Sequence, residues 1–204
     1  MHKKKVVDLE NYRAGEPDLE LVIEQHDHSL RPGTGLLYGQ YTIISQINAG
    51  GFGITYLAND SLGRKVAIKE CFPGELCLRD GNEMRARNAS LRGELDNIVG
   101  HFLTEAQRLS SLAHESIVHV HQIFEENATA YMAMDYVEGS DLLDLVEGVN
   151  NPSMSPVSIQ TLGEQVLHAV AYVHDKGFLH RDLAPDNIMA VSYTHLTLPT
   201  NREV

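Results

Sequence analysis

The sequence predicts an α+β fold in which an antiparallel sheet comes first and a helical part follows. Strand-like runs rich in β-branched residues occur between residues 41 and 136, joined by the short turns that are typical of hairpins. A long amphipathic helix is predicted over residues 158–176, where apolar residues recur at steps of three and four. The composition is that of an ordinary globular protein, since 43% of the 204 residues are hydrophobic and 22% are charged.

Charge and cysteine content narrow the class of protein. The formal net charge of -12 disfavours a nucleic-acid-binding surface and attraction to anionic membranes. No apolar run is long enough to span a bilayer, and the basic N-terminus lacks the apolar segment of a signal peptide. The only cysteines, Cys71 and Cys77, have no neighbouring His/Cys pair, so we expect free thiols in a cytoplasmic protein.

Three strands are predicted in the first half of the chain. Residues 41–47 and 54–58 flank a glycine-rich turn at 48–53, so they form a hairpin. Glycines at such a tip let backbone N–H groups approach phosphate oxygens, although most glycine clusters between strands are plain turns. The third strand, 64–70, contains Val-Ala-Ile-Lys, whose Lys69 also fits an edge residue that extends into solvent.

A long connection and a helix are predicted next. Residues 71–97 are polar and interrupted by proline and glycine, so we expect a connection that is at most partly ordered. A helix is predicted from residue 98, because apolar residues recur there at helical spacing. Glu105 borders the apolar face of this helix, where a carboxylate needs a partner, and Arg108 is the local alternative on a solvated flank.

The second half predicts another hairpin and two helices. Residues 117–124 and 128–136 are strand-like and flank a short polar turn. A short helix is predicted over 141–147. The helix over 158–176 ends at Gly177, a residue typical of helix C-termini.

The stretch that carries chemistry comes after this helix and reads His180-Arg181-Asp182-Leu183-Ala184-Pro185-Asp186-Asn187. It matches the catalytic-loop pattern H-R-D-x-x-x-x-N of protein kinases. In that chemistry Asp182 accepts a hydrogen bond from the attacking hydroxyl, and Asn187 offers an amide oxygen to Mg²⁺. Arg181 would hold a phosphate or a carboxylate from elsewhere. The alternative is an Asp/Asn-rich turn without a catalytic role.

Residues from about 41 to 189 together resemble a protein kinase, in wording most like bacterial serine/threonine-type kinases. The motifs occur in the order of that family: a glycine-rich loop, Val-Ala-Ile-Lys, a helix with an inward glutamate, an apolar hairpin that leads to a hinge, and His-Arg-Asp. The resemblance implies a two-lobed α+β fold, with an antiparallel-sheet small lobe and an incomplete helical large lobe.

The resemblance also implies roles for individual residues. The catalytic set would be Asp182, Lys69, Glu105, Asn187 and Arg181. Lys69 would bind the α- and β-phosphates of ATP and pair with Glu105, although the separation, 105 − 69 = 36, is longer than usual for the family. Asn187 would be the ligand of Mg²⁺.

The nucleotide site implied by the resemblance draws on the glycine-rich loop, two strands and the hinge. Ala67 and Met189 would sandwich the adenine, Met134 would be the gatekeeper behind it, and residues 135–137 would be the hinge. The complete set of implied nucleotide-binding residues is Ile47, Asn48, Gly50, Gly51, Phe52, Gly53, Thr55, Ala67, Lys69, Met134, Asp135, Tyr136, Val137 and Met189.

Three residues depart from the pattern of the family. Asn48 stands where the first glycine of the loop is expected, and Thr55 replaces the usual valine over the adenine. Ala184 stands where serine/threonine kinases usually have a lysine near the γ-phosphate, which bears on the rate of transfer more than on nucleotide binding.

The end of the chain departs from the family most. No Asp-Phe-Gly follows the catalytic loop. Residues 191–204 resemble the translated adapter tails of truncated environmental gene models, so we expect a non-native tail, the alternative being a genuine short strand. The expected division is therefore a polar tail or linker at 1–37, the small lobe and hinge at 38–137, the start of the large lobe at 138–190, and the non-native tail at 191–204.

These features predict a fragment of an ATP-dependent protein kinase. The full-length parent would transfer the γ-phosphoryl group of ATP to Ser or Thr hydroxyls of a protein substrate, with Mg²⁺ bound to the nucleotide. We expect no nucleic-acid partner and no membrane segment. The rival hypothesis is a nucleotide-binding pseudokinase scaffold, which Ala184 favours; a binding module outside the kinases would need every motif to be a coincidence. We expect the 204-residue chain to be inactive, because the apolar stripe of the 158–176 helix would lack the helices on which it packs.

Overall fold

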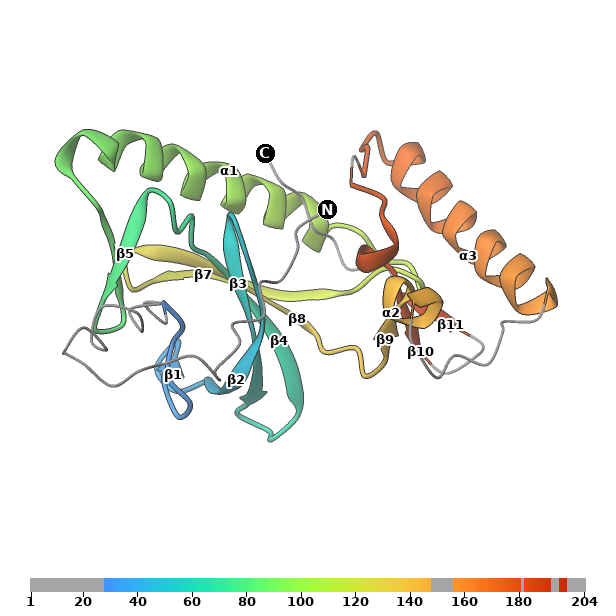
Figure 1. Ribbon diagram of the computed structural model, residues 1–204, viewed down its shortest axis with the longest axis horizontal. Coiled ribbons are helices and arrows are strands. Elements are labelled where there is room, and N and C mark those ends of the chain that lie inside the picture. Colours follow the sequence, from blue (N-terminus) through green and yellow to red (C-terminus); the bar gives the residue numbers. More distant parts are fainter. Residues whose placement is uncertain (1–27, 148–155, 181, 192–194, 198–204) are drawn as a thin grey trace, which may run out of the picture.

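The computed structural model describes residues 28–147, 156–180, 182–191 and 195–197, which form a sheet-rich lobe followed by a smaller helical part (Figure 1). The elements of the first lobe are β1 (Gly35–Leu36), β2 (Tyr41–Gly50), β3 (Gly53–Asp60), β4 (Lys65–Cys71), β5 (Cys77–Asp80), β6 (Glu83–Ala86), η2 (Ala89–Leu91), α1 (Arg92–Ser110), β7 (Val120–Glu126) and β8 (Thr129–Asp135). The elements that follow are β9 (Ser140–Asp141), α2 (Leu142–Glu147), α3 (Pro156–Asp175), η3 (Pro185–Asn187), β10 (Met189–Val191) and β11 (His195–Thr197).

The main sheet is antiparallel and has the strand order β1-β2-β3-β4-β8-β7. Strand β4 lies inside it, so that Lys69 is opposite Thr55 of β3 on one side and Met132 of β8 on the other. Successive side chains of a strand point to opposite faces, and Glu70 therefore faces away from Lys69. The strands predicted around residues 41–70 and the hairpin predicted around 117–136 are confirmed.

Two apolar clusters hold this lobe together, one on each face of β4. The first cluster contains the fully buried residues Leu36, Ile43, Tyr56, Ile68 and Tyr131, together with Leu95 from the first half of α1. The second cluster lies between the sheet and the second half of α1, and it contains Ala67, Ala106, Val118, Val120, Met132 and Met134. Helix α1 thus packs across the sheet and belongs to both clusters (Figure 1).

The expectation that residues 71–97 form a loosely ordered connection is wrong. Strands β5 and β6 form a hairpin there, and Gly81, with φ +62°, takes the first position of its two-residue turn. Each strand has four residues, too short for a periodic pattern to be visible in the sequence. Helix α1 begins at Arg92, six positions before the predicted residue 98, after the Asn88 side chain caps η2.

The assignment of residues 1–37 to a tail needs a correction at its end. Leu30 and Leu36 are buried in the first cluster, and β1 pairs with β2. Backbone hydrogen bonds also join this segment to β2, from Gly33 N to Ile43 O (2.8 Å) and from Ile43 N to Thr34 O (2.9 Å). Its two buried leucines are six residues apart and only Leu36 belongs to a strand, so their spacing gives no strand or helix signal. Residues 1–27 lie outside the described residues.

The part of the chain after β8 is built on a small sheet and α3. Strand β10 pairs with β9 on one side and with β11 on the other. Residues 195–197 form β11, whereas residues 192–194 and 198–204 lie outside the described residues. The predicted non-native origin of residues 191–204, and its alternative of a genuine short strand, both stay open. The helices predicted over 141–147 and 158–176 are confirmed, and Gly177, with φ +80°, ends α3 as expected.

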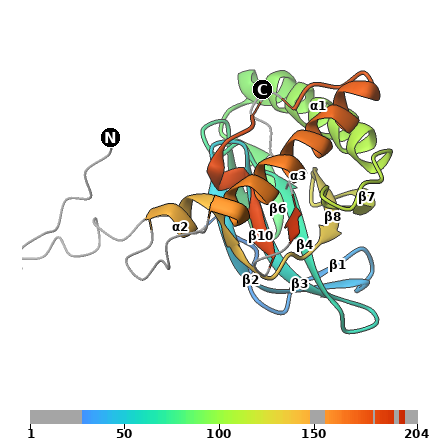
Figure 2. The ribbon, with the colours of Figure 1, turned by 90° about the vertical axis from the view of Figure 1, so that its right-hand side faces the viewer.

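Helix α3 packs against the segment that joins α1 to β7 (Figure 2). Val173, Ala169, Leu162 and Val166 contact Leu112, Ile117 and Ile188, and the Tyr172 hydroxyl accepts a hydrogen bond from Ala113 N (3.1 Å). The expectation that the apolar stripe of this helix lacks a packing surface is thus wrong for its C-terminal half.

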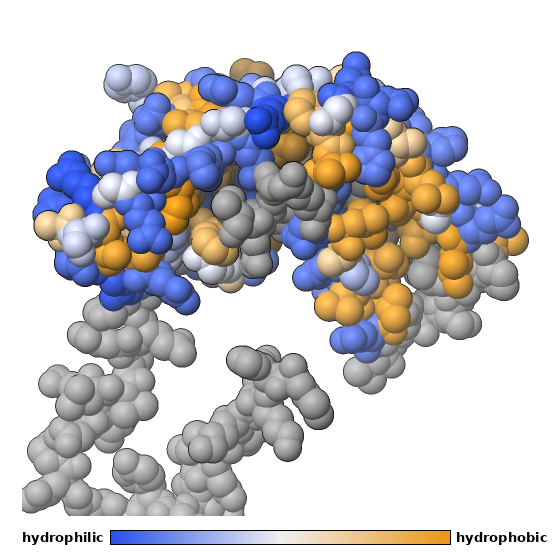
Figure 3. Space-filling view, turned by 90° about the horizontal axis from the view of Figure 1, so that it is seen from above, coloured by the Kyte–Doolittle hydropathy of each residue, from blue (hydrophilic) through white to orange (hydrophobic). Residues whose placement is uncertain are grey.

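Other apolar side chains of α3 remain exposed. These are Val157, Ile159 and Leu167, and Figure 3 shows apolar side chains gathered over this end of the molecule. Within the described part of the chain, no helix is both long and apolar enough to cross a membrane.

Candidate functional site

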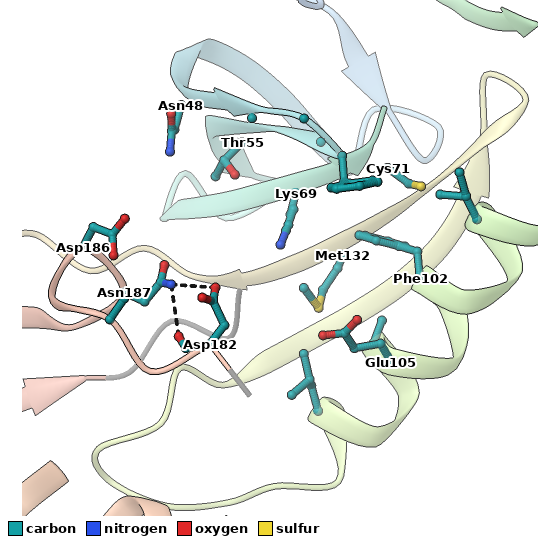
Figure 4. Close-up of a pocket in the computed structure, with 18 of the residues that line it drawn as sticks. Asn48, Thr55, Lys69, Cys71, Phe102, Glu105, Met132, Asp182, Asp186 and Asn187 are labelled. Carbon is teal, nitrogen blue, oxygen red and sulfur yellow. Dashed lines mark hydrogen bonds between the residues drawn. The ribbon is translucent and has the colours of Figure 1, made fainter. Parts of the chain in front are cut away.

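The site is a cavity of about 470 Å³ enclosed by the β2–β3 hairpin, β4, α1, β8 and the loop around η3 (Figure 4). Most of the predicted catalytic and phosphate-binding residues line it, although they come from segments far apart in the sequence. The predicted residues that line the cavity are Asn48, Gly50, Gly51, Phe52, Gly53, Thr55, Lys69, Glu105, Asp182 and Asn187.

The glycines of the β2–β3 turn serve two different purposes. A Cβ atom on Gly53 would lie 2.6 Å from the backbone oxygen of Glu70, so this position admits no side chain without moving β4. No atom lies within 4 Å of a Cβ built on Gly50 or Gly51. These two glycines instead leave the wall of the cavity open, where backbone N–H groups can approach an anion.

Lys69 extends from β4 into the cavity, and Glu105 points into the same space from α1 (Figure 4). Burial lowers the pKa of Lys69 from its ordinary value, while the nearby carboxylates of Glu105 and Asp182 act in the opposite direction. A lysine in this position is a desolvated cation, and its attraction for a phosphate is stronger there than at the surface.

Asp182 and Asn187 face Lys69 from the other side of the cavity. The side-chain nitrogen of Asn187 donates hydrogen bonds to the backbone oxygen of Asp182 (3.2 Å) and to its Oδ2 atom (2.8 Å) (Figure 4). The turn between them closes through η3, where Asn187 N donates to Ala184 O (3.0 Å). The loop therefore fixes the Asp182 carboxylate, which is the arrangement that a positioned base requires.

Carboxylates dominate the charge of the cavity. Among the described residues that line it, Lys69 is the only basic side chain, whereas Glu105, Asp141, Asp182 and Asp186 are acidic. No group of three or more His, Cys, Asp or Glu residues in the described part of the chain forms a complete metal site. Carboxylate and amide oxygens are nevertheless the ligands that Mg²⁺ prefers, and it completes its shell with phosphates and water.

Other predicted site residues are not among those that line this cavity. Met134 lies opposite Ala67 in the neighbouring strand, and both are buried in the second cluster. Asp135 is the first residue of the predicted hinge, and its N–H already donates a hydrogen bond to His119 O (3.0 Å). Contacts of adenine with Ile47, Ala67, Met134, Asp135, Tyr136, Val137 and Met189 stay predictions. Arg181 lies outside the described residues.

The structure adds residues that sequence reasoning missed. Met132 lines the cavity two positions before Met134, on the same face of β8, so strand alternation was the available signal. Phe102, one turn before Ala106 on α1, also lines it. Cys71 stands two positions after Lys69 on the same face of β4, so strand alternation was the available signal for it as well, whereas Asp186 reaches the cavity through the fold of the loop around η3.

Comparison with known proteins agrees with the architecture. The family model "Protein kinase domain" matches residues 41–198. The chain is 33% identical over 155 residues to the serine/threonine-protein kinase PrkC of Bacillus subtilis, covering 74% of this chain and 20% of PrkC. It is 31% identical over 160 residues to the serine/threonine-protein kinase pkn2 of Myxococcus xanthus, covering 78% of this chain and 17% of pkn2. The chain thus spans about a fifth or less of these two relatives.

Solved structures show the same fold. The apo form of PpkA-294 superposes with a TM-score of 0.78 at 30% identity, covering 84% of this chain and 61% of that one. Rad53 1-466 in complex with AMP-PNP superposes with a TM-score of 0.61 at 23% identity, covering 79% of this chain and 38% of that one.

Proposed function

Because this chain belongs to the protein kinase family, and its relatives are serine/threonine kinases, we propose that it binds ATP in the cavity and that the full-length protein transfers the γ-phosphoryl group to Ser or Thr hydroxyls of a protein substrate. The observation that supports this proposal most is the meeting of three separate segments in one cavity. Lys69 and the open glycine turn lie on one side of it, and the hydrogen-bonded Asp182–Asn187 loop lies on the other.

In this proposal each group of residues in the cavity has its own role. Gly50, Gly51 and Lys69 bind the phosphates, and Glu105 holds the lysine toward them. Asp182 accepts the hydrogen bond of the acceptor hydroxyl and takes its proton as the oxygen–phosphorus bond forms. The bond from the γ-phosphorus to its bridging oxygen breaks at the same time, and ADP leaves. Catalysis of this kind rests mainly on positioning and on stabilising charge.

Mg²⁺ fits the chemistry of the cavity. One lysine faces the phosphates across a site rich in carboxylates, so a bound divalent cation would neutralise charge that the described side chains leave uncompensated. Asn187, through its amide oxygen, is the residue that we assign to the metal. The chain contains no Asp-Phe-Gly after the catalytic loop, and we therefore expect the 204-residue chain to bind nucleotide but to transfer phosphate poorly.

A Lys69→Ala variant tests the nucleotide site in the 204-residue chain. A hydrogen bond to a charged group contributes about 1.5–3 kcal/mol, which predicts a loss of roughly 10- to 150-fold in ATP affinity. Affinity for adenosine should stay within about twofold, because adenosine carries no phosphate. Titration calorimetry with both ligands measures the difference.

The matched control is Lys65→Ala, at the other end of the same strand. The Lys65 ammonium pairs with Glu138 at the surface (2.7 Å), and Lys65 does not line the cavity. Affinity for both ligands should be unchanged in this variant. Equal losses for ATP and adenosine in Lys69→Ala would contradict the proposed role of the lysine.

A nucleotide-binding scaffold without transfer activity is the second candidate function. The observation that favours it is Ala184, which lines the cavity where a cation near the γ-phosphate is usual in the family. The two functions differ in one measurement, since a scaffold binds ATP with the same dependence on Lys69 but transfers no phosphate from it in the full-length protein.

A further inference from the structure

The face of β4 opposite Lys69 carries a buried ion pair that the proposed function does not use. Glu70 is 0% exposed, and its Oε2 atom lies 2.6 Å from Nη2 of Arg79, whose side chain is 6% exposed. Removing two charges from water costs several kcal/mol per ion, and the pair persists only where further hydrogen bonds complete it. The partners of the two residues therefore indicate what the pair holds in place.

Glu70 joins the three central strands of the main sheet. The Tyr56 hydroxyl of β3 donates to its Oε2 atom (2.7 Å), and the Tyr131 hydroxyl of β8 donates to its Oε1 atom (2.9 Å). Burial, with the carboxylate of Glu70 as the second cause, raises the pKa of both phenols, so both remain protonated donors. The carboxylate thus fixes β4 to its neighbours immediately beside Lys69.

Arg79 connects this carboxylate to the β5–β6 hairpin. It belongs to β5, its guanidinium lies 4.6 Å from the centre of the Phe72 ring, and its Nη1 atom donates to Asn82 O (2.9 Å) in the turn. Its Nε atom donates to His28 O, before β1. The hairpin is also bonded to the β7–β8 turn, through Met84 N and Asn127 O (2.8 Å).

The hairpin in turn determines where α1 begins. Arg87, just after β6, donates to Gly74 O through Nε (3.2 Å) and Nη2 (2.9 Å), and Asn88 then caps the turn that leads into the helix. Leu95 in the first turn of α1 is buried in the same cluster as Cys77 and Met84 of the hairpin. The end of α1 nearer the hairpin is thus held by the hairpin, and the same helix carries Glu105 into the cavity.

The root of the hairpin also contacts the glycine-rich turn. Phe72 N donates to Phe52 O (3.1 Å), and Gly53 packs against the backbone of Glu70 itself. The glycine turn and Lys69 are therefore each one covalent or hydrogen-bonded step from Glu70 or Phe72, whereas Glu105 is linked to the hairpin through α1, whose first turn the hairpin holds.

We propose that Glu70 and Arg79 are positioning residues for the phosphate-binding side of the cavity: their ion pair fixes the β5–β6 hairpin to β4 and, through the hairpin, holds α1 with Glu105 on the wall facing Lys69. This inference rests on the proposed nucleotide site. It explains why the chain has 36 positions from Lys69 to Glu105, since the additional residues build the hairpin that carries Arg79.

The test compares a variant without the ion pair with one that alters the hairpin elsewhere. Removing only one partner would leave a buried charge, so the main variant is the double substitution Glu70→Gln with Arg79→Met, and Arg79→Lys is a milder second variant. The control is Arg85→Gln, which breaks exposed contacts with Asp80 (2.9 Å) and Glu83 (3.7 Å) on the same hairpin.

Two readouts separate positioning from a purely structural role. The first is affinity for ATP and for adenosine, measured by calorimetry at a temperature where circular dichroism shows each variant to be folded. The second is hydrogen exchange of the α1 amides near Glu105. We expect the double variant to lose about tenfold in ATP affinity, with adenosine within about twofold and faster exchange in α1. Arg79→Lys should show a smaller change in the same direction, and Arg85→Gln should match the wild type.

Each other outcome has a defined meaning. A folded double variant with lowered melting temperature but unchanged ATP affinity and α1 exchange would overturn the proposal, and so would variants that both fail to fold. If ATP affinity depends on Lys69 but not on the ion pair, the positioning role fails while the proposed function stands. If the wild type binds no ATP, the proposed function fails, and α1 exchange alone decides whether the pair positions the helix.

Discussion

The two sides of the cavity are supported by apolar cores whose side chains are buried to different degrees. Lys69 lies on a strand between β3 and β8, and the cluster on the opposite face of this strand includes the fully buried Tyr56, Ile68 and Tyr131. Asp182 and Asn187 lie on a loop that follows α3, a helix that leaves Ile159 55% exposed. The proposed nucleotide binding and the proposed phosphoryl transfer would therefore depend on separate packing, and changes in one core should affect one of these activities more than the other.

Truncation of one buried and one exposed isoleucine tests this contrast most strongly. Ile68→Ala should lower the free energy of unfolding by about 2–5 kcal/mol, because it removes a fully buried side chain and leaves a cavity. Ile159→Ala, at the exposed surface of α3, should change it by less than about 0.5 kcal/mol. Urea unfolding followed by circular dichroism measures both values. Comparable losses of unfolding free energy would show that the two isoleucines are equally important for packing, and would contradict the contrast between the two cores.

Asp182→Asn tests the transfer side of the cavity. In the full-length protein this variant should reduce phosphoryl transfer by at least about 10²-fold, the contribution of a positioned base, while ATP affinity changes by less than about twofold. Asp175→Asn, at the exposed end of α3, is the control and should leave transfer unchanged. A radiolabel transfer assay with a Ser/Thr peptide measures the rate, and unimpaired transfer would remove Asp182 from the mechanism.

Alkaline pH should destabilise the small-lobe side through its two buried thiols. Burial raises the pKa of Cys71 and of Cys77 to about 12, from the ordinary value of 9.0. Above pH 9 the unfolded chain loses these protons while the folded chain keeps them. Stability is therefore complete below about pH 9 and falls as the pH rises toward 12, by about 1.4 kcal/mol per thiol at pH 10.

Urea unfolding at pH 8, 9 and 10 measures this loss. A Cys77→Ala variant should lose less stability over the same range, because one of the two titrating thiols is gone. Equal pH dependence in wild type and variant would contradict the assignment to the thiols.

Ala184→Lys should have the smallest effect of these changes. A lysine there would place a cation near the γ-phosphate and should raise transfer in the full-length protein by up to about tenfold, without a change in adenosine affinity. The matched variant Ala184→Gln adds similar length without charge and should give no gain. An increase with both variants would point to packing rather than charge.

The sequence predicted those parts of the fold that depend on neighbouring residues. The apolar Val-Ala-Ile run before Lys69, the helical spacing in α3 and the glycine at 177 each specify backbone geometry within a few positions. The segment at 28–37 and the β5–β6 hairpin escaped prediction, because Leu30 and Leu36 are buried among residues from distant parts of the chain and each strand of the hairpin has only four residues. Such contacts leave no periodic signal.

The residue types of the site were determined by sequence alone: a lysine at the end of an apolar strand, a glycine-rich turn, and an aspartate and an asparagine at fixed spacing. Each of these patterns is short, so its members are close together in the chain and can be read from the sequence. The tertiary structure decided which faces meet. It brought Met132 and Asp186 to the cavity, and it buried Glu70 against Arg79, because burial and pairing depend on side chains that only the folded sheet, hairpin and helix bring together.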